Sequence, residues 1–322
     1  MSAILWALAA AVGYGSSDFA AGLAARRASV IRVALLTEAV CVVVAGLVLP
    51  LTGAGPPDAR AVGWGMVSGL GGVSGALVLY LGFRHAAFSV AGPLSAVAAA
   101  GFSVLAGLLL GERPGAFALT GIALALPAIV GVSASARGPS GAPAPGPASE
   151  PDSAPEPGPV RAPDDEQAAA GRRPARAVAR GRAPTGVGYG LAAGVCFAVL
   201  FIGLNQAGSG HGLWPVFCGQ VTALAAVSSL AAFTGDLRLP EARGAGLAAL
   251  AGLTGGPGTI FYFFATHHGM LAVAAVLSSL YPAVTIMLAR LLVGERLTAV
   301  RVAGLSLAAA SVALIAVGGP GG

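Results

Sequence analysis

The amino-acid sequence predicts an all-α integral membrane protein, with ten transmembrane helices arranged as two inverted five-helix repeats. Three observations lead to this prediction. The chain of 322 residues is 56% hydrophobic and only 10% charged, whereas a typical soluble domain has about 25% charged residues. Apolar runs of about 20 residues, long enough to cross about 30 Å of hydrocarbon, recur along it. The second half of the chain also repeats the first half at a fixed offset.

Ten apolar segments, separated by short breakers, are the predicted transmembrane helices. The first unit comprises residues 3–25, 31–51, 61–82, 88–110 and 115–135, and the second comprises residues 186–207, 213–234, 244–266, 270–292 and 298–318. The amino-terminal segment lacks the basic residues that begin a secretory signal peptide, so we expect it to be retained as the first helix.

The internal repeat is defined by a charged triplet that occurs twice. Gly111-Glu112-Arg113 returns as Gly294-Glu295-Arg296, which sets the offset at 183 residues (294 − 111). At this offset, without gaps, other residue types also coincide: Ser95 with Ser278, His85 with His268, and Arg60 with Arg243. Because each unit crosses the membrane an odd number of times, the second unit is expected to insert upside down relative to the first.

The two triplets are interpreted as capping turns in preference to catalytic or gating groups. Gly111 and Gly294 can adopt the left-handed backbone conformation that ends a helix. Glu112 and Glu295 then lie just ahead of the next helix along the chain, whose exposed N–H groups favour a negative charge.

Residues 137–184 are predicted to be a disordered linker between repeats at residues 1–136 and 185–322. The segment is rich in Pro, Ala and Gly and holds six acidic residues and seven arginines. It can bury too little apolar surface to offset the entropy lost on ordering. A regulatory binding role for this segment stays open.

The arginines predict the orientation of the chain. Of the 18 basic residues, all except Arg60 and Arg113 fall on the side of the membrane that holds the linker. The positive-inside rule then places the linker in the cytoplasm and both termini outside, in a plasma (inner) membrane protein. With no basic stripe on a soluble fold, no nucleic-acid partner is expected.

A five-helix unit with a Gly-Glu-Arg turn between its last two helices, occurring twice, resembles the EamA repeat of the drug/metabolite transporter (DMT) superfamily. Residues 1–27, which include GYGSSDFAAGLAARR, also resemble the first helix of such proteins. The resemblance covers nearly everything outside residues 137–184, a segment longer than the usual connector. It implies secondary transport, often export, of a small metabolite such as an amino acid, by alternating access between the two halves.

Two acidic residues, Asp18 and Glu38, lie inside predicted spans, where an acid costs about 2.5–3.5 kcal/mol and tends to face a cavity or a partner. Each is eight residues from the turn at residues 26–30, so both should lie about 12 Å from the same end. Two close carboxyl groups in a low dielectric do not both ionise, which suits a site where a proton competes with a cation or amine. The structural alternative is that Glu38 pairs with Arg32 or faces a solvated vestibule, and that Asp18 bonds Ser or Tyr hydroxyls.

The resemblance also implies a central cavity between the repeats, which polar residues of the helices would line. For each such residue, a satisfied hydrogen bond between helices is the alternative, and Asn205 could lie too near its helix end to reach the cavity. The candidate substrate- or proton-binding residues are Tyr14, Asp18, Glu38, Tyr80, Asn205, Gln220, Tyr262, Ser278 and Tyr281.

Prolines and glycines mark where helices are expected to break. Gly256-Pro257-Gly258 is predicted to interrupt the eighth helix, and Pro93 and Pro282 fall within the fourth and ninth. Transporters bend at broken helices around a cavity at the membrane midplane, and tight helix packing is a compatible interpretation.

No metal, cofactor or catalytic residue is expected. The three cysteines lie far apart in apolar runs without a CxxC spacing, and His267 and His268 point about 100° apart on their helix. The alternative function is an integral-membrane enzyme acting on a lipid or polyprenyl carrier, which usually shows Asp, His and Arg clustered at one interface. A passive pore would need a ring of repeated polar residues. The expected partners are therefore a small-molecule substrate, protons and the lipid bilayer.

Overall fold

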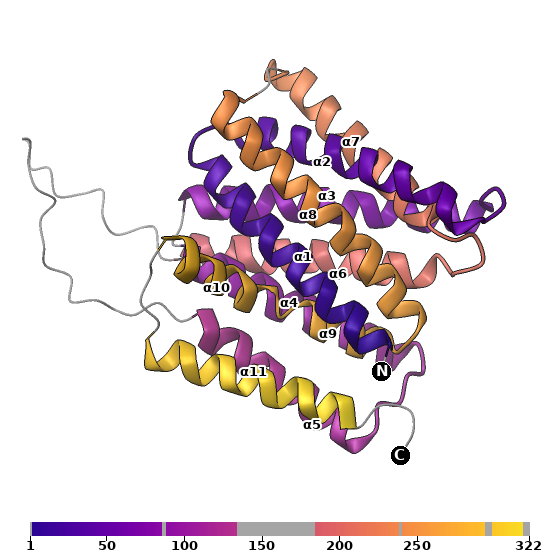
Figure 1. Ribbon diagram of the computed structural model, residues 1–322, viewed down its shortest axis with the longest axis vertical. Coiled ribbons are helices and arrows are strands. Elements are labelled where there is room, and N and C mark those ends of the chain that lie inside the picture. Colours follow the sequence, from indigo (N-terminus) through magenta and orange to yellow (C-terminus); the bar gives the residue numbers. More distant parts are fainter. Residues whose placement is uncertain (1, 86–87, 134–183, 238–239, 294–297, 318–322) are drawn as a thin grey trace, which may run out of the picture.

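The computed structural model describes residues 2–85, 88–133, 184–237, 240–293 and 298–317, and it is helical without strands over these ranges (Figure 1). The helices of the first half are α1 Ser2–Ala25, α2 Val30–Val48, the 3-10 turn η1 Leu49–Thr52, α3 Ala59–His85, α4 Phe88–Leu109 and α5 Ala116–Ser133. Those of the second half are α6 Pro184–Gln206, α7 Trp214–Thr234, α8 Ala242–His267, α9 Leu271–Ser278, α10 Tyr281–Val293 and α11 Ala299–Val317.

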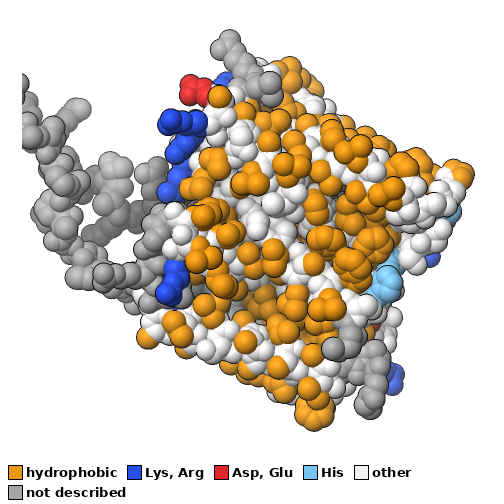
Figure 2. All heavy atoms as spheres, in the orientation of Figure 1, with side chains coloured by type: hydrophobic (Ala, Val, Ile, Leu, Met, Phe, Trp, Pro, Cys, Tyr) orange, Lys and Arg blue, Asp and Glu red, His pale blue; other side chains and the backbone are white. Residues whose placement is uncertain are grey.

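Most of these helices are long and apolar enough to cross a membrane. Nine such segments occur among the described residues when α9 and α10 are counted as one, and α5 contributes a shorter apolar segment, Ala116–Gly131. Figure 2 shows hydrophobic side chains spread over the visible face, with the Lys and Arg atoms mostly along one edge. Large apolar side chains such as Phe233, Leu109 and Leu51 are more than three-quarters exposed. A surface of this kind fits lipid contact, and the all-α membrane class is confirmed.

Each predicted span corresponds to helical structure, but the ninth, residues 270–292, is divided into α9 and α10. The break falls at Ser279 and Leu280, just ahead of Pro282. A proline has no N–H to bond the carbonyl of Ser278, four residues earlier, and its ring crowds that carbonyl. The helix therefore ends before Pro282 and restarts.

The predicted interruption at residues 256–258 is wrong, because α8 runs without a break from Ala242 to His267 with Pro257 inside it. The flanking glycines bring α1 against α8 so closely that a Cβ at Gly13 would lie 2.7 Å from the Cα of Gly258. This packing supports the helix where the proline removes one hydrogen bond. Pro93 likewise lies inside an unbroken α4.

The first Gly-Glu-Arg triplet forms a turn, as expected, but it caps a different helix. Gly111 has a left-handed φ of +92°. The Glu112 carboxylate accepts hydrogen bonds from the backbone N–H groups of Leu271 at 2.5 Å and Ala272 at 2.9 Å. It thus caps α9, in the other half of the chain, and the expectation that it caps the next helix was wrong. The second triplet, residues 294–296, lies outside the described residues, as does nearly all of the predicted linker.

Helices from the two halves of the chain interleave. α8 packs against both α1 and α2, and α3 packs against both α6 and α7. α5 packs against α11. The pair α5 and α11 lies at the lower edge of Figure 1. Much of the buried core, including Tyr262, Phe263 and Leu204, therefore lies between the halves.

Candidate functional site

A cavity lies between helices of both halves, lined by α1, α2 and α3 from the first and by α6, α7 and α8 from the second. Its empty volume is about 680 Å³, including the part that opens to the surroundings. Five of the candidate residues line it, and they come from four helices: Tyr14, Asp18, Glu38, Tyr80 and Gln220. Reasoning from polar residues inside apolar spans therefore found both acids of this cavity.

Asp18 on α1 and Glu38 on α2 are half-buried side chains that both line the cavity. Asp18 lies seven residues before the end of α1 and Glu38 eight residues after the start of α2, so the predicted common depth of about 10–12 Å is retained. Over the described residues, neither carboxyl group makes a hydrogen bond or an ion pair. Pairing of Glu38 with Arg32, one of the two alternatives for this residue, is wrong, because Arg32 pairs with Asp236 instead.

The surroundings of the two acids are hydroxyl, thiol and aromatic groups. Tyr80 on α3 lies within electrostatic range of both carboxyl groups. Tyr14 and Tyr281 lie within range of Asp18, and Cys41 lies within range of Glu38. An isolated charge in such surroundings costs free energy unless a partner neutralises it.

Four candidate residues do not line the cavity, and each has a hydrogen-bond partner on another helix. Asn205 donates to the Thr266 hydroxyl at 2.9 Å, and the Tyr262 hydroxyl donates to the Phe201 carbonyl at 3.3 Å. The Ser278 hydroxyl donates to the Ala7 carbonyl at 3.3 Å, and the Tyr281 hydroxyl lies 2.9 Å from that of Ser95. For these four side chains the structure shows the interhelical hydrogen bond that was the alternative.

Sequence reasoning missed six other lining residues that have polar, thiol or aromatic side chains: Ser17, Thr37, Cys41, Ser68, Phe197 and Thr259. Three of them could have been found from helical spacing, because Ser17 lies three residues after Tyr14, Cys41 three residues after Glu38, and Thr37 four residues before Cys41. Cys41 was interpreted as a small hydrophobe, yet its thiol points to the Gly252 carbonyl at 3.6 Å beside the cavity. Ser68, Phe197 and Thr259 carry no local signal of this kind.

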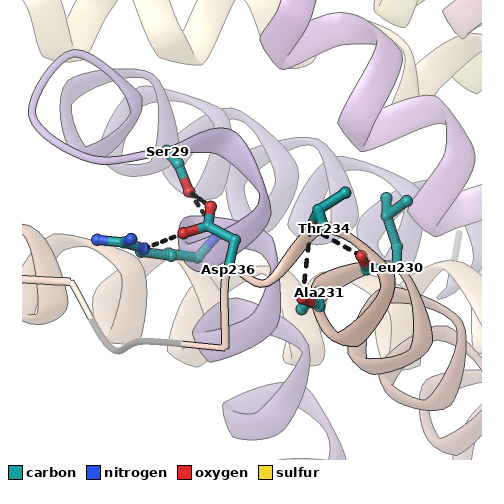
Figure 3. Close-up of polar contacts among 6 residues, drawn as sticks. Ser29, Leu230, Ala231, Thr234 and Asp236 are labelled. Carbon is teal, nitrogen blue, oxygen red and sulfur yellow. Dashed lines mark hydrogen bonds and ion pairs between the residues drawn. The ribbon is translucent and has the colours of Figure 1, made fainter.

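Polar contacts join the two halves at one end of the cavity helices (Figure 3). Asp236 follows Gly235, whose left-handed φ of +68° ends α7. The Asp236 carboxylate accepts a hydrogen bond from Arg32 Nε at 2.5 Å and another from the Ser29 hydroxyl. Ser29 also caps α2 by accepting from the Arg32 N–H. The turn between α1 and α2 is thereby tied to the turn after α7.

A second set of contacts joins the halves at the opposite ends of these helices. His211 Nε2, before α7, lies 3.6 Å from the Asp58 carboxylate, before α3. Arg60 Nε donates to the Gln206 carbonyl at 2.9 Å. Asp58 caps α3 by accepting from the Ala61 N–H at 2.7 Å, and this hydrogen bond lowers the pKa of its exposed carboxyl group, with a further contribution from His211. The turn before α3 is thereby tied to the turn before α7.

Comparison with known proteins points in one direction. The sequence pattern of the EamA-like transporter family matches residues 1–134 and 184–317. A similar solved structure, a crystal structure 18% identical in sequence, superposes with a TM-score of 0.63 over 96% of this chain and 98% of the other, a likeness that concerns the fold alone. No match was found among curated protein sequences.

Proposed function

Because the chain belongs to the EamA-like transporter family, we propose that it is a secondary transporter that exports a small metabolite across the plasma membrane by alternating access. The observation that carries this proposal is the cavity between the two halves, lined by two carboxyl groups that make no hydrogen bond or ion pair with the described residues. Ionisable groups inside membrane spans mark substrate and proton pathways. A membrane enzyme is not proposed, because this is a family of transporters.

We further propose that the two halves, with repeats at residues 1–136 and 185–322 joined by a linker at residues 137–184, form an inverted pair. The packing supports this arrangement. In the two repeats, α1, α2 and α3 correspond to α6, α7 and α8. The contact of α1 with α8 then corresponds to that of α6 with α3, and the contact of α2 with α8 corresponds to that of α7 with α3, and all four contacts are present. Reciprocal contacts of this kind are typical of two units related by a two-fold axis.

In this proposal, the contacts at the two ends of the cavity close it in turn. One set joins the α1–α2 turn to the turn after α7. The other set joins the α6–α7 turn, which corresponds to the α1–α2 turn, to the turn before α3, which corresponds to the turn after α7. A partly exposed ion pair contributes only about 0–1 kcal/mol, so either set can open during a cycle. The 2.5 Å contact of Arg32 with Asp236 is the tighter of the two ion pairs.

Proton coupling is proposed for the two cavity acids. A carboxyl group that is reached from each side in turn can release a proton to one side after binding it from the other. Inward proton flow would then drive export, with the linker on the cytoplasmic side, as the arginine distribution suggests.

Transport in liposomes tests this function. Purified protein is reconstituted, a pH gradient is imposed, and movement of a panel of radiolabelled metabolites is followed against empty liposomes. At least one solute should move faster with the gradient than without it, and movement should collapse when an ionophore dissipates the gradient. A panel that moves no faster than in empty liposomes would contradict the proposal.

A further inference from the structure

We infer that the cavity selects an organic cation without a carboxylate group, such as an amine, over a zwitterionic amino acid. This inference rests on the proposed transport function and names its substrate class. It follows from the charge, the shape and the surroundings of the cavity.

The charged groups of the lining are acids only. Asp18 and Glu38 line the cavity, and none of the described lining residues is Arg or His, while the chain contains no lysine. An ammonium group would neutralise a carboxylate that otherwise has no partner. A zwitterion would bring a carboxylate for which the lining has no cationic partner, and an anion would be repelled by both acids.

The helices that line the cavity carry their basic residues near their ends. These residues are Arg32, which is paired with Asp236, together with Arg60, Arg84, His85, Arg243 and His267. The ionisable groups within electrostatic range of the acids are Tyr14 and Tyr281 for Asp18, Cys41 for Glu38, and Tyr80 for both. None of these four side chains can carry a positive charge, so none of them would neutralise the acids as a proton or a bound cation would.

The shape and chemistry of the lining favour an organic cation over a metal ion. Hard metal ions take six or more oxygen ligands at short distances, whereas no group of three or more His, Cys, Asp or Glu side chains among the described residues could hold a metal. The rings of Tyr14, Tyr80 and Phe197 line the cavity instead, and aromatic faces attract organic cations.

The two acids and the most apolar part of the lining lie toward different ends of the cavity, although Gln220, six residues after the start of α7, adds an amide near the apolar part. Leu204 lies two residues before the end of α6, and Val216 lies two residues after the start of α7. Both are therefore about 3 Å from their helix ends, at the end of the cavity opposite to the α1–α2 turn. Asp18 and Glu38 lie toward the other end of the cavity. A molecule with an amine at one end and an apolar body would match this order, with its amine beside the acids and its body beside Phe197, Leu200 and Leu204.

A charge-matched set of ligands tests the inference. Phenethylamine, phenylalanine and phenylacetate share one ring and differ in charge, and benzyltrimethylammonium is a cation that cannot lose a proton. Binding to the purified full chain is measured by calorimetry, and transport is measured in liposomes. Both cations should bind at least about tenfold more tightly than phenylalanine or phenylacetate. Acidification should weaken the binding of benzyltrimethylammonium, because protons then neutralise the carboxyl groups.

Variants then assign the preference to the cavity. Asp18→Asn and Glu38→Gln should each weaken cation binding at least about tenfold, and the double variant should lose its dependence on pH. Glu241→Gln removes an exposed acid that makes no side-chain cap to α8, so it should bind cations as the natural chain does. Thermal unfolding of each variant shows that it is folded.

The outcomes separate this inference from the proposed function. If no solute, including those of the wider metabolite panel, moves faster than in empty liposomes, both this inference and the proposed function are contradicted. Transport of phenylalanine or phenylacetate without transport of the cations would overturn the inference alone. Three further results would also overturn it. They are cation binding that survives in a folded double variant, sodium binding that replaces amine binding, and no binding of either cation.

Discussion

At the scale of the residue, the proposed function depends on two carboxyl groups, Asp18 and Glu38, that make no hydrogen bond or ion pair within the described part of the chain. A group that bonds nothing in the protein contributes little to folding, so its cost has to be offset elsewhere. Natural proteins keep such groups where a ligand or a proton uses them. Asp18 and Glu38 therefore differ in kind from Glu112, whose two carboxylate oxygens each accept a hydrogen bond from a backbone N–H group.

The Asp18→Asn change should separate folding from function. It removes no hydrogen bond or ion pair within the described residues, so the melting temperature in detergent should stay the same or rise. Transport should lose much of its dependence on the pH gradient, because one of the two groups that exchange protons is gone. A folded Asp18→Asn protein whose transport keeps its normal pH dependence would remove Asp18 from the coupling role.

The Glu112→Ala change, in contrast, should lower the stability of the protein. Loss of the cap leaves the N–H groups of Leu271 and Ala272 without acceptors, which should cost about 1–2 kcal/mol of stability. Glu241→Ala is the matched control, because Glu241 precedes α8 without a side-chain cap, and it should cost less than about 0.5 kcal/mol. Equal unfolding midpoints for the two variants would show that the Glu112 contact does not stabilise α9.

At the scale of the element, the helices could be predicted from the sequence because the membrane imposes a simple rule. A span must be apolar over about 20 residues, and each of the ten predicted spans matches a helix or, for the ninth, a pair of helices. The continuity of α8 through Pro257 could not be predicted, because it depends on the close packing of α1 against α8. The partner of Glu112 could not be predicted either, since α9 is 159 residues away along the chain.

The candidate site could be predicted from the sequence only in part. An acid inside an apolar run is visible in the sequence, and both such acids line the cavity. Hydroxyl and amide side chains are less informative, because a neighbouring helix can satisfy them, as Thr266 does for Asn205. Which polar residues face the cavity depends on how the helices are rotated against one another, and that rotation is set by packing between distant parts of the chain.

The contact between the α1–α2 turn and the turn after α7 should act as a latch that holds its end of the cavity closed. Asp236→Asn weakens the ion pair with Arg32, which is expected to contribute about 1 kcal/mol or less. The open population should therefore rise by about fivefold at most. Modification of Cys41, which lines the cavity, by a membrane-impermeant thiol reagent should speed up accordingly from that side.

This measurement uses a Cys196→Ser, Cys218→Ser background, in which Cys41 is the remaining thiol. Asp58→Asn, at the opposite end, should not speed modification from the Asp236 side. Arg32→Ala should also speed modification, and the double variant should have less than the summed effect of the two changes, since both weaken the Arg32–Asp236 ion pair. Additive effects of the two changes would show that they do not act through their ion pair.

At the scale of the whole molecule, interleaving of the halves explains why the cavity lies between them. Neither half could build the site alone, because Asp18 and Glu38 come from the first half and Gln220 and Thr259 from the second. An arrangement with reciprocal contacts also offers two related closed states, each with a different end sealed. The same structure thus accounts for the site and for its access.

The inverted arrangement predicts where each part of the chain is exposed. With five spans per unit, tags placed at either terminus should be accessible from outside the cell, whereas a tag inserted between residues 137 and 184 should be protected until the membrane is permeabilised. Protease or antibody accessibility in intact cells measures this directly. Tags at the termini and in the linker that are exposed to the same compartment would be incompatible with inverted halves.

The most direct test of the account follows Cys41 from both sides of the membrane. Alternating access requires that a cavity residue be reached from each side in turn, so an impermeant thiol reagent applied to right-side-out or inside-out vesicles should modify Cys41 in both cases. A transported cation, or a change in pH, should speed modification from one side while slowing it from the other. Modification from one side alone under every condition would contradict alternating access through this cavity.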